Sequence, residues 1–227
     1  MPAQPTGLPG NPPERGGTVA QQGEFGFVPL WPFRSEAEAV EWQAAYRTDG
    51  ADAWHLDAEL TALTFTREYL GLRTVDQVVV GVGRSDTGGD ERFVGVGFVA
   101  PNGAQITAAV LHLARIGAGA DAPWEVVGSD GGTLSVDEPG YGATVTSPLA
   151  VRGRITGVDE SLTVQIRVHG SAEPVGAVSG IAAGGTDEPW SATVPFTAAP
   201  GSVLTIAVST GGHIAEVEHF AVTGARH

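Results

Sequence analysis

The sequence carries six histidines, and two of them lie close enough along the chain to suggest a metal site. His213 and His219 flank Glu216 and Glu218, and histidine nitrogens with a carboxylate are typical zinc ligands. The segment reads as a strand, in which six residues span about 20 Å at roughly 3.3 Å per residue. One ion cannot bridge that distance unless the strand bulges. We therefore expect surface histidines and predict no metal site.

Other catalytic arrangements are incomplete. The chain has no Gly-x-Ser-x-Gly elbow, and Gly81-x-Gly83 lacks the third glycine and the helix of a dinucleotide-binding loop. His112 falls in a long predicted strand on the face of Ile106 and Val110, where a packed core histidine is favoured over a general base. No catalytic residue and no cofactor is predicted.

Acidic doublets recur at predicted turns, and oxygen ligands at the ends of a sandwich can bind calcium. The doublets are Asp137-Glu138, Asp159-Glu160 and Asp187-Glu188. None belongs to an EF-hand loop. Solvated turn residues are the favoured interpretation.

Three arginines stand out against an acidic background. Arg152, Arg154 and Arg167 alternate with apolar residues and should lie on the outer face of a sheet. They either pair with aspartates or glutamates of the protein or form a binding face for an acidic ligand.

Aromatic residues of the N-terminal half offer a second candidate binding site. Trp42 and Tyr46, with Trp54 and Tyr69, could line a pocket. Burial in a core is the stronger interpretation, because aromatic side chains contribute much of the stability of small domains.

Carboxylates of the same half leave an enzymatic alternative open. A glycoside hydrolase needs two carboxylates at a controlled separation. Asp49, Asp52, Asp57, Glu59 and Glu68 are near enough in sequence to be considered, although no spacing singles out a pair.

The elements that would position these residues are clearest in the C-terminal half, where three runs alternate strictly between apolar and polar residues. They cover residues 149–156, 162–169 and 190–197. Each pattern predicts a strand with one dry and one wet face. Further strands are expected at 134–138, 175–181, 203–209 and 214–222, the last with a bulge near His219. Such short, closely spaced strands are typical of a β-sandwich.

The N-terminal half predicts helices followed by an antiparallel meander. Ser35-x-x-Glu38 forms a capping box for a helix to about Tyr46, and a second helix should run from Asp57 to Gly71. Strands are expected at 27–33, 77–84, 92–100, 104–116 and 124–128, with a polar hairpin at 85–90 and a tight turn at Asn102-Gly103. This α+β layout is similar to cystatin-like and NTF2-like folds.

Composition gives the domain boundaries. Residues 1–25 are rich in Pro, Gly and Gln and are predicted to be a flexible tether. An α+β domain should cover 26–128 and an all-β immunoglobulin-like sandwich 133–225. Ser129-Asp130-Gly131-Gly132 is the natural boundary between them.

Charge and composition exclude several classes of function. The net charge is −14 and every basic residue is arginine, so the field has the wrong sign for a nucleic-acid partner. Without cysteine the chain has neither disulfides nor thiolate metal sites. No apolar run of about 18 residues predicts a transmembrane helix, and no signal peptide is visible.

The stretch LSVDEPGYGATVTSPLAVRGRITGVDESLTVQIRV, from Leu134 onward, resembles the immunoglobulin-like domain associated with bacterial spore germination. The features that carry the resemblance are Pro139, the Ser147-Pro148-Leu149 step, Gly153, Leu162–Ile166 and Trp190–Phe196. The preceding domain is similar to its partner domain in actinobacterial envelope proteins. The resemblance implies an exported, often lipid-anchored protein of the cell envelope or extracellular space and supplies no catalytic residue. A lipid-bearing cysteine would have to lie upstream in the precursor.

The sequence thus predicts a non-enzymatic, membrane-tethered envelope protein with a binding or scaffolding role, whose partner is an envelope protein or glycan. An envelope polymer hydrolase is the alternative.

Overall fold

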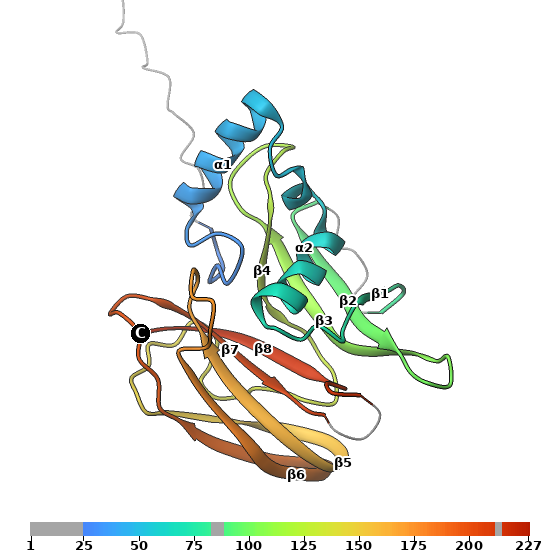
Figure 1. The fold of residues 1–227 in the computed structure, drawn as a ribbon. Helices are drawn as coiled ribbons and strands as arrows, with labels where there is room; N and C mark the ends of the chain where they lie inside the picture. Colours follow the sequence, from blue (N-terminus) through green and yellow to red (C-terminus); the bar gives the residue numbers. More distant parts are fainter. Residues whose placement is uncertain (1–24, 83–88, 212–214) are drawn as a thin grey trace, which may run out of the picture.

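The computed structural model describes residues 25–82, 89–211 and 215–227, and it shows a mostly β protein. Two helices pack on a four-strand antiparallel sheet, and a curled antiparallel sheet follows (Figure 1). We refer to them as the first and the second sheet. The predicted order of an α+β part before an all-β part is confirmed.

The first helix, α1 (Glu36–Asp49), begins at the predicted N-cap, where the Ser35 hydroxyl accepts the Glu38 N–H at 3.3 Å. The Glu38 carboxylate reaches back to the N–H of Arg34, one residue earlier than a standard capping box requires. The helix continues one turn beyond Tyr46 and ends at Gly50, whose φ of 74° is left-handed. Arg47 fixes its last turn through an ion pair with Asp121 at 2.6 Å.

The second predicted helix consists of two pieces. A 3-10 turn, η1 (Ala53–Leu56), precedes α2 (Ala58–Thr64), and the Asp57 side chain caps α2 by accepting the N–H groups of Glu59 and Leu60. A π-helical turn, η2 (Phe65–Tyr69), follows directly. The expected stop at Gly71 is confirmed by its positive φ of 78°. The wider turn of η2 ends the helix with Phe65 and Tyr69 both buried.

The first sheet has the strand order β1-β2-β3-β4, all antiparallel. Its strands are β1 (Gln77–Val79), β2 (Glu91–Val99), β3 (Gln105–Arg115) and β4 (Trp124–Ser129). The tight turn at Asn102-Gly103 joins β2 and β3 as predicted, with Gly103 at φ 83°. The segment expected as a strand at 27–33 contributes only a bridge between Trp31 and Val126.

The second sheet has the order β6-β5-β7-β8. Its strands are β5 (Leu149–Arg167), β6 (Gly176–Val194), β7 (Val203–Ser209) and β8 (Phe220–Arg226). Residues 134–138 join the edge of β5 through bridges at Leu134 and Glu138, which makes five strands in a curled half-barrel. The sheet curls because β5 and β6 bend together through three register shifts between Ile155 and Val164.

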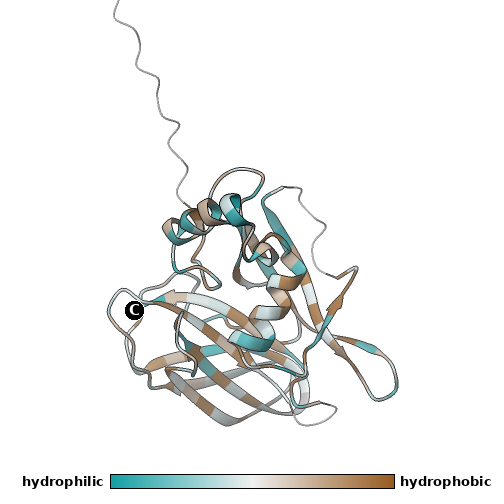
Figure 2. Cartoon of the chain, turned by 45° about the horizontal axis from the view of Figure 1, so that its top comes forward, coloured by the Kyte–Doolittle hydropathy of each residue, from teal (hydrophilic) through white to brown (hydrophobic). Residues whose placement is uncertain are grey.

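The alternation that predicted the strands is confirmed on the concave side of this sheet. The three runs are parts of β5 and β6, and their apolar residues form one buried cluster with β7 and β8. Figure 2 shows the alternating hydropathy along these strands. The prediction for the last strand was wrong, because β8 begins after His219 and runs to Arg226 without a bulge.

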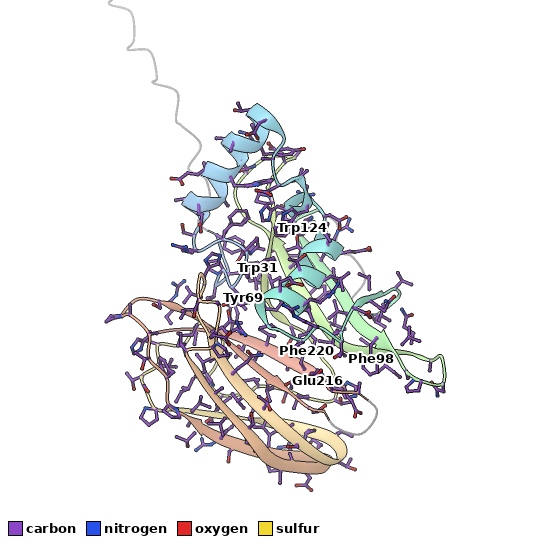
Figure 3. The ribbon with its side chains drawn as sticks, in the orientation of Figure 1. Trp31, Tyr69, Phe98, Trp124, Glu216 and Phe220 are labelled. Atoms are coloured by element: carbon purple, nitrogen blue, oxygen red, sulfur yellow. The ribbon has the colours of Figure 1, made fainter. Side chains whose placement is uncertain are left out.

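The two sheets share one core across residues 129–132. The largest buried cluster combines residues of η2 and the first sheet with Ala207, Phe220 and Val222 of the second. Trp31 and Tyr69 stack at 6.2 Å between centroids, and Figure 3 shows both above the second sheet.

A clamp at the end of β4 ties the two sheets together. The Ser129 hydroxyl accepts the N–H of Val222 at 2.8 Å and donates to its carbonyl at 3.3 Å. Both groups belong to the outer edge of β8, which is an edge strand of the second sheet.

We predict that Ser129→Ala lowers the free energy of unfolding by about 1–2 kcal/mol, because both Val222 main-chain groups lose their partner in a partly buried place. Urea unfolding monitored by tryptophan fluorescence measures the change. Ser191→Ala on the exposed face of β6 is the control and should change stability by less than ~0.5 kcal/mol. Equal stabilities of the two variants would show that the clamp contributes nothing.

Candidate functional site

A pocket of about 420 Å³ lies where the two sheets meet, and we call it the junction pocket. One wall comes from the N-terminal segment, β3 and β4, and the other from residues 131–136, Tyr141 and β8. Its lining residues are Phe27, His112, Val127, Gly128, Ser129, Gly131, Gly132, Leu134, Ser135, Val136, Tyr141, Ala221, Val222 and Thr223.

An oriented histidine stands in the first wall. His112 Nε2 lies 2.8 Å from the Glu91 carboxylate, and its ring stacks on Phe93 at 4.6 Å between centroids. Phe27 approaches the same ring edge-on at 5.2 Å. The carboxylate and two phenyl rings therefore fix the plane of the imidazole, which can offer a hydrogen bond to a ligand. The prediction of a packed strand histidine holds in part, since 18% of the side chain is exposed.

Tyr141 forms the opposite rim of the pocket. Its hydroxyl accepts the Val28 N–H at 2.7 Å, while 48% of the residue is exposed. Partial burial raises the pKa of the phenol, so the hydroxyl stays protonated over the physiological range. Phe27 and Tyr141 thus present half-exposed rings on two sides of the pocket. Neither residue, nor Glu91, was singled out from the sequence.

The three predicted arginines do not lie together. Arg152 pairs with Glu138 at 2.5 Å and Arg154 with Asp187 at 2.6 Å, both on the exposed convex face. Arg167 is 7% exposed, so the prediction that it faces solvent was wrong. Its guanidinium lies over the Tyr69 ring at 5.6 Å because the helical end of the first half covers this part of β5.

The two predicted binding aromatics, Trp42 and Tyr46, lie on α1 and belong to a packed aromatic cluster. Trp42 and Tyr46 stack on each other at 5.2 Å, and Trp42 also contacts His55 and Phe33. Neither Trp42 nor Tyr46 lines the junction pocket.

His55 is buried within this aromatic cluster. Its ring lies 3.7 Å from that of Trp54, centroid to centroid. Burial lowers the pKa of His55 to about 4.

The carboxylates considered for hydrolysis make local contacts. Asp57 caps α2, the Asp49 side chain accepts the Ala51 N–H at 2.9 Å, and Glu68 lies 3.7 Å from Arg73. None of the five candidates lines the junction pocket.

Potential metal ligands are dispersed. Within residues 25–82, 89–211 and 215–227, no group of three His, Asp or Glu side chains could hold a metal ion. In two of the acidic doublets one member forms an ion pair with an arginine, Glu138 with Arg152 and Asp187 with Arg154. The side chains of the third doublet, Asp159-Glu160, lie outside the described part of the structure, as does His213. In the same described ranges no helix has the length and apolarity to cross a membrane.

One carboxylate is completely buried. Glu125 on β4 is 0% exposed; one of its oxygens accepts the Phe33 N–H at 3.0 Å, and the other has no partner among the described residues. Burial raises the pKa of Glu125 well above its ordinary value, and the main-chain N–H groups of Phe33 and Trp31 oppose this only in part. Burial thus favours the protonated form of this carboxyl group, which bonds to Phe33 in the N-terminal segment.

Comparisons of the chain with protein-family models, with curated proteins and with solved structures each found no match. The resemblance of roughly the last 95 residues to a germination-associated domain therefore stays a prediction.

We predict that Glu125→Gln makes the protein more stable at pH 7, by on the order of 1 kcal/mol or more. The folded-state pKa is raised, so the stability contributed by this group is complete below pH 4.5 and falls as pH rises toward the folded pKa. In the variant, the free energy of unfolding should no longer fall as the pH rises. Urea unfolding between pH 4.5 and 8 measures this. Glu41→Gln on the exposed side of α1 is the control. Parallel curves for the wild type and Glu125→Gln would contradict the prediction.

For His55 we predict a pH dependence of stability with the opposite sign. Its pKa is lowered from 6.5 to about 4, so the unfolded chain takes up the proton first and stability falls as pH drops from 6.5 to 4. The loss should reach no more than ~3 kcal/mol. His55→Phe should abolish this dependence in the same unfolding series, whereas His219→Gln should keep it. An unchanged acid slope in His55→Phe would refute the assignment.

Proposed function

We propose that this protein is a non-enzymatic binding protein of the cell envelope and that its ligand occupies the junction pocket. The supporting observation is the convergence of Phe27, His112 and Tyr141 on one pocket between two sheets. Ligand sites are typically 300–1,000 Å³ in volume, mostly apolar, and common at the meeting of two structural units. The junction pocket fits each of these criteria.

The geometry suits binding better than turnover. Among the described lining residues, His112 bonds to Glu91 and the Ser129 hydroxyl to the Val222 main chain, so these two groups do not form a nucleophile–base pair with each other. A fixed imidazole and a protonated phenol on opposite sides serve to orient a ligand, and the apolar surface between them supplies affinity.

The cellular setting is part of the proposal. The resemblance of roughly the last 95 residues implies export, an immunoglobulin-like assignment of residues 133–225 and a membrane tether upstream in the precursor. The partner would be an envelope protein or glycan. Arg152 and Arg154 are already paired with acidic residues, so the convex face offers less to a ligand than the pocket does.

An envelope polymer hydrolase remains the alternative function. It requires two carboxylates that face one substrate. Asp57 and Asp49 serve as helix and turn caps, and no specific contact favours hydrolysis over binding.

The test uses a variant that fills the pocket. Val136→Trp enlarges a partly buried side chain of the pocket lining, and we expect loss of at least 90% of ligand binding. Saturation-transfer NMR on a solubilised envelope extract, with the full chain at matched concentration, detects whichever small molecule of the extract binds. The expected result is a set of ligand signals that the wild type shows and Val136→Trp lacks.

Val99→Trp is the matched control, because Val99 is 55% exposed and does not line the pocket. It should bind as the wild type does. Tyr141→Ala provides a second measurement, since it removes a wall instead of filling the space. Wild-type signals that persist in Val136→Trp, or a wild type that gives no signal, would contradict the proposal.

A further inference from the structure

A second hollow lies next to the junction pocket. It measures about 140 Å³ and is lined by β3, by residues 131–134, and by His219 and Phe220 at the start of β8. Gly131, Gly132 and Leu134 line both spaces. We call residues 131–134 the strap, because both hollows use it as a wall.

The crest of the strap carries no side chain. Gly131 has φ 66° and Gly132 φ 113°, and a Cβ built on Gly131 would meet no atom within 4 Å. At the glycine pair, the wall that the two hollows share therefore carries no side chain. Two adjacent hollows that share a wall of bare backbone suit a linear ligand with at least two repeating units.

The lining chemistry indicates a neutral ligand. Among the described residues that line the two hollows, none is Asp, Glu or Arg. The net charge of −14 also disfavours the approach of an anionic ligand. What the lining provides is the aromatic rings of Phe27 and Tyr141, hydroxyl groups and one histidine in each hollow. The hydroxyl groups belong to Ser135, Thr223, Thr107 and Thr133, and the histidines are His112 and His219.

The strand edges around the pocket disfavour an extended peptide. A peptide that adds to a sheet needs free main-chain groups along an edge. On β8 the main chain of Val222 is bonded to Ser129, and the Gly224 carbonyl accepts the Gly142 N–H at 2.8 Å. On β4 the N–H and carbonyl of Val126 bond to the N-terminal segment. A saccharide needs no such ladder, because its rings pack on aromatic faces and its hydroxyls bond to side chains.

We propose that the ligand is a linear, neutral oligosaccharide that spans both hollows across the strap. The inference rests on the proposed function of the junction pocket and adds the chemical class and minimum length of the ligand. Units in the two hollows are covalently linked, so occupation of the second adds affinity at small entropic cost. Affinity should therefore grow steeply with chain length.

The test is calorimetric titration of the full chain with N-acetylglucosamine oligomers and with maltooligosaccharides of one to five units. We expect at least one series to gain tenfold or more in affinity between the disaccharide and the tetrasaccharide. Gly131→Asn adds a side chain at the crest, and asparagine tolerates the left-handed backbone that this position requires. The variant should lose the gain and keep the disaccharide affinity.

Gly103→Asn is the matched control, because Gly103 also has a positive φ and open space around its Cβ but lies in the β2–β3 turn. It should keep the gain. The inference is overturned if neither series binds, if affinity does not depend on length, or if Gly131→Asn and Gly103→Asn behave alike. Loss of the envelope-extract signals after protease treatment would also overturn it in favour of a peptide. Each of these outcomes leaves the proposed function standing as long as Val136→Trp still abolishes the extract signals.

Discussion

The structure depends on one constraint. One end of the convex face of the second sheet is exposed to solvent, whereas the other end carries polar and apolar residues that the first half of the chain covers. Gln165, Arg167 and Thr205 lie on that covered part and are all less than 9% exposed. The first half of the chain supplies hydrogen-bond partners for two of them. Gln165 donates to the Leu70 carbonyl at 3.1 Å, and Thr205 shares a hydrogen bond with the Tyr69 hydroxyl at 3.1 Å. Without the first half, these polar groups would return to water and the apolar residues around them would be exposed.

The same constraint explains the place of the junction pocket. The first half sits on the second sheet near η2 and again at Ser129, and the two contacts lie on different elements. The shared core lies between these contacts, and the strap carries the chain from one sheet to the other next to Ser129. The pocket is therefore a product of how two curved sheets meet. Its walls come from segments as far apart in sequence as Phe27 and Thr223.

Local patterns in the sequence predicted most of the elements, because their causes are local. Ser35, Asp57 and Gly71 mark helix ends through capping and backbone geometry, and the Asn102-Gly103 pair fixes a tight turn. Strict alternation located β5 and β6, although it could not show that each is one bent strand. The start of β8 was missed because the apolar pattern before it comes from a loop that packs into the shared core through Val217.

The candidate site could not be read in the same way, because it arises from contacts between distant segments. His112 stacks on Phe93 only because the β2–β3 ladder shifts register between Val96 and Gly97, which no turn motif reveals. Arg167 looked exposed because alternation reports two faces of a strand and not what covers each face. Tyr141 lies in a glycine-rich turn, and only the approach of Val28 gives it a role.

The position of β8 determines how the protein unfolds. Phe220 and Val222 point into the core shared with the first sheet, whereas Ala221 and Ala225 point into the core of the half-barrel. This strand, Phe220–Arg226, is thus buried on both sides. Neither half has a complete interior without it, so melting should be a single cooperative event and fragments that lack β8 should associate through their uncovered surfaces.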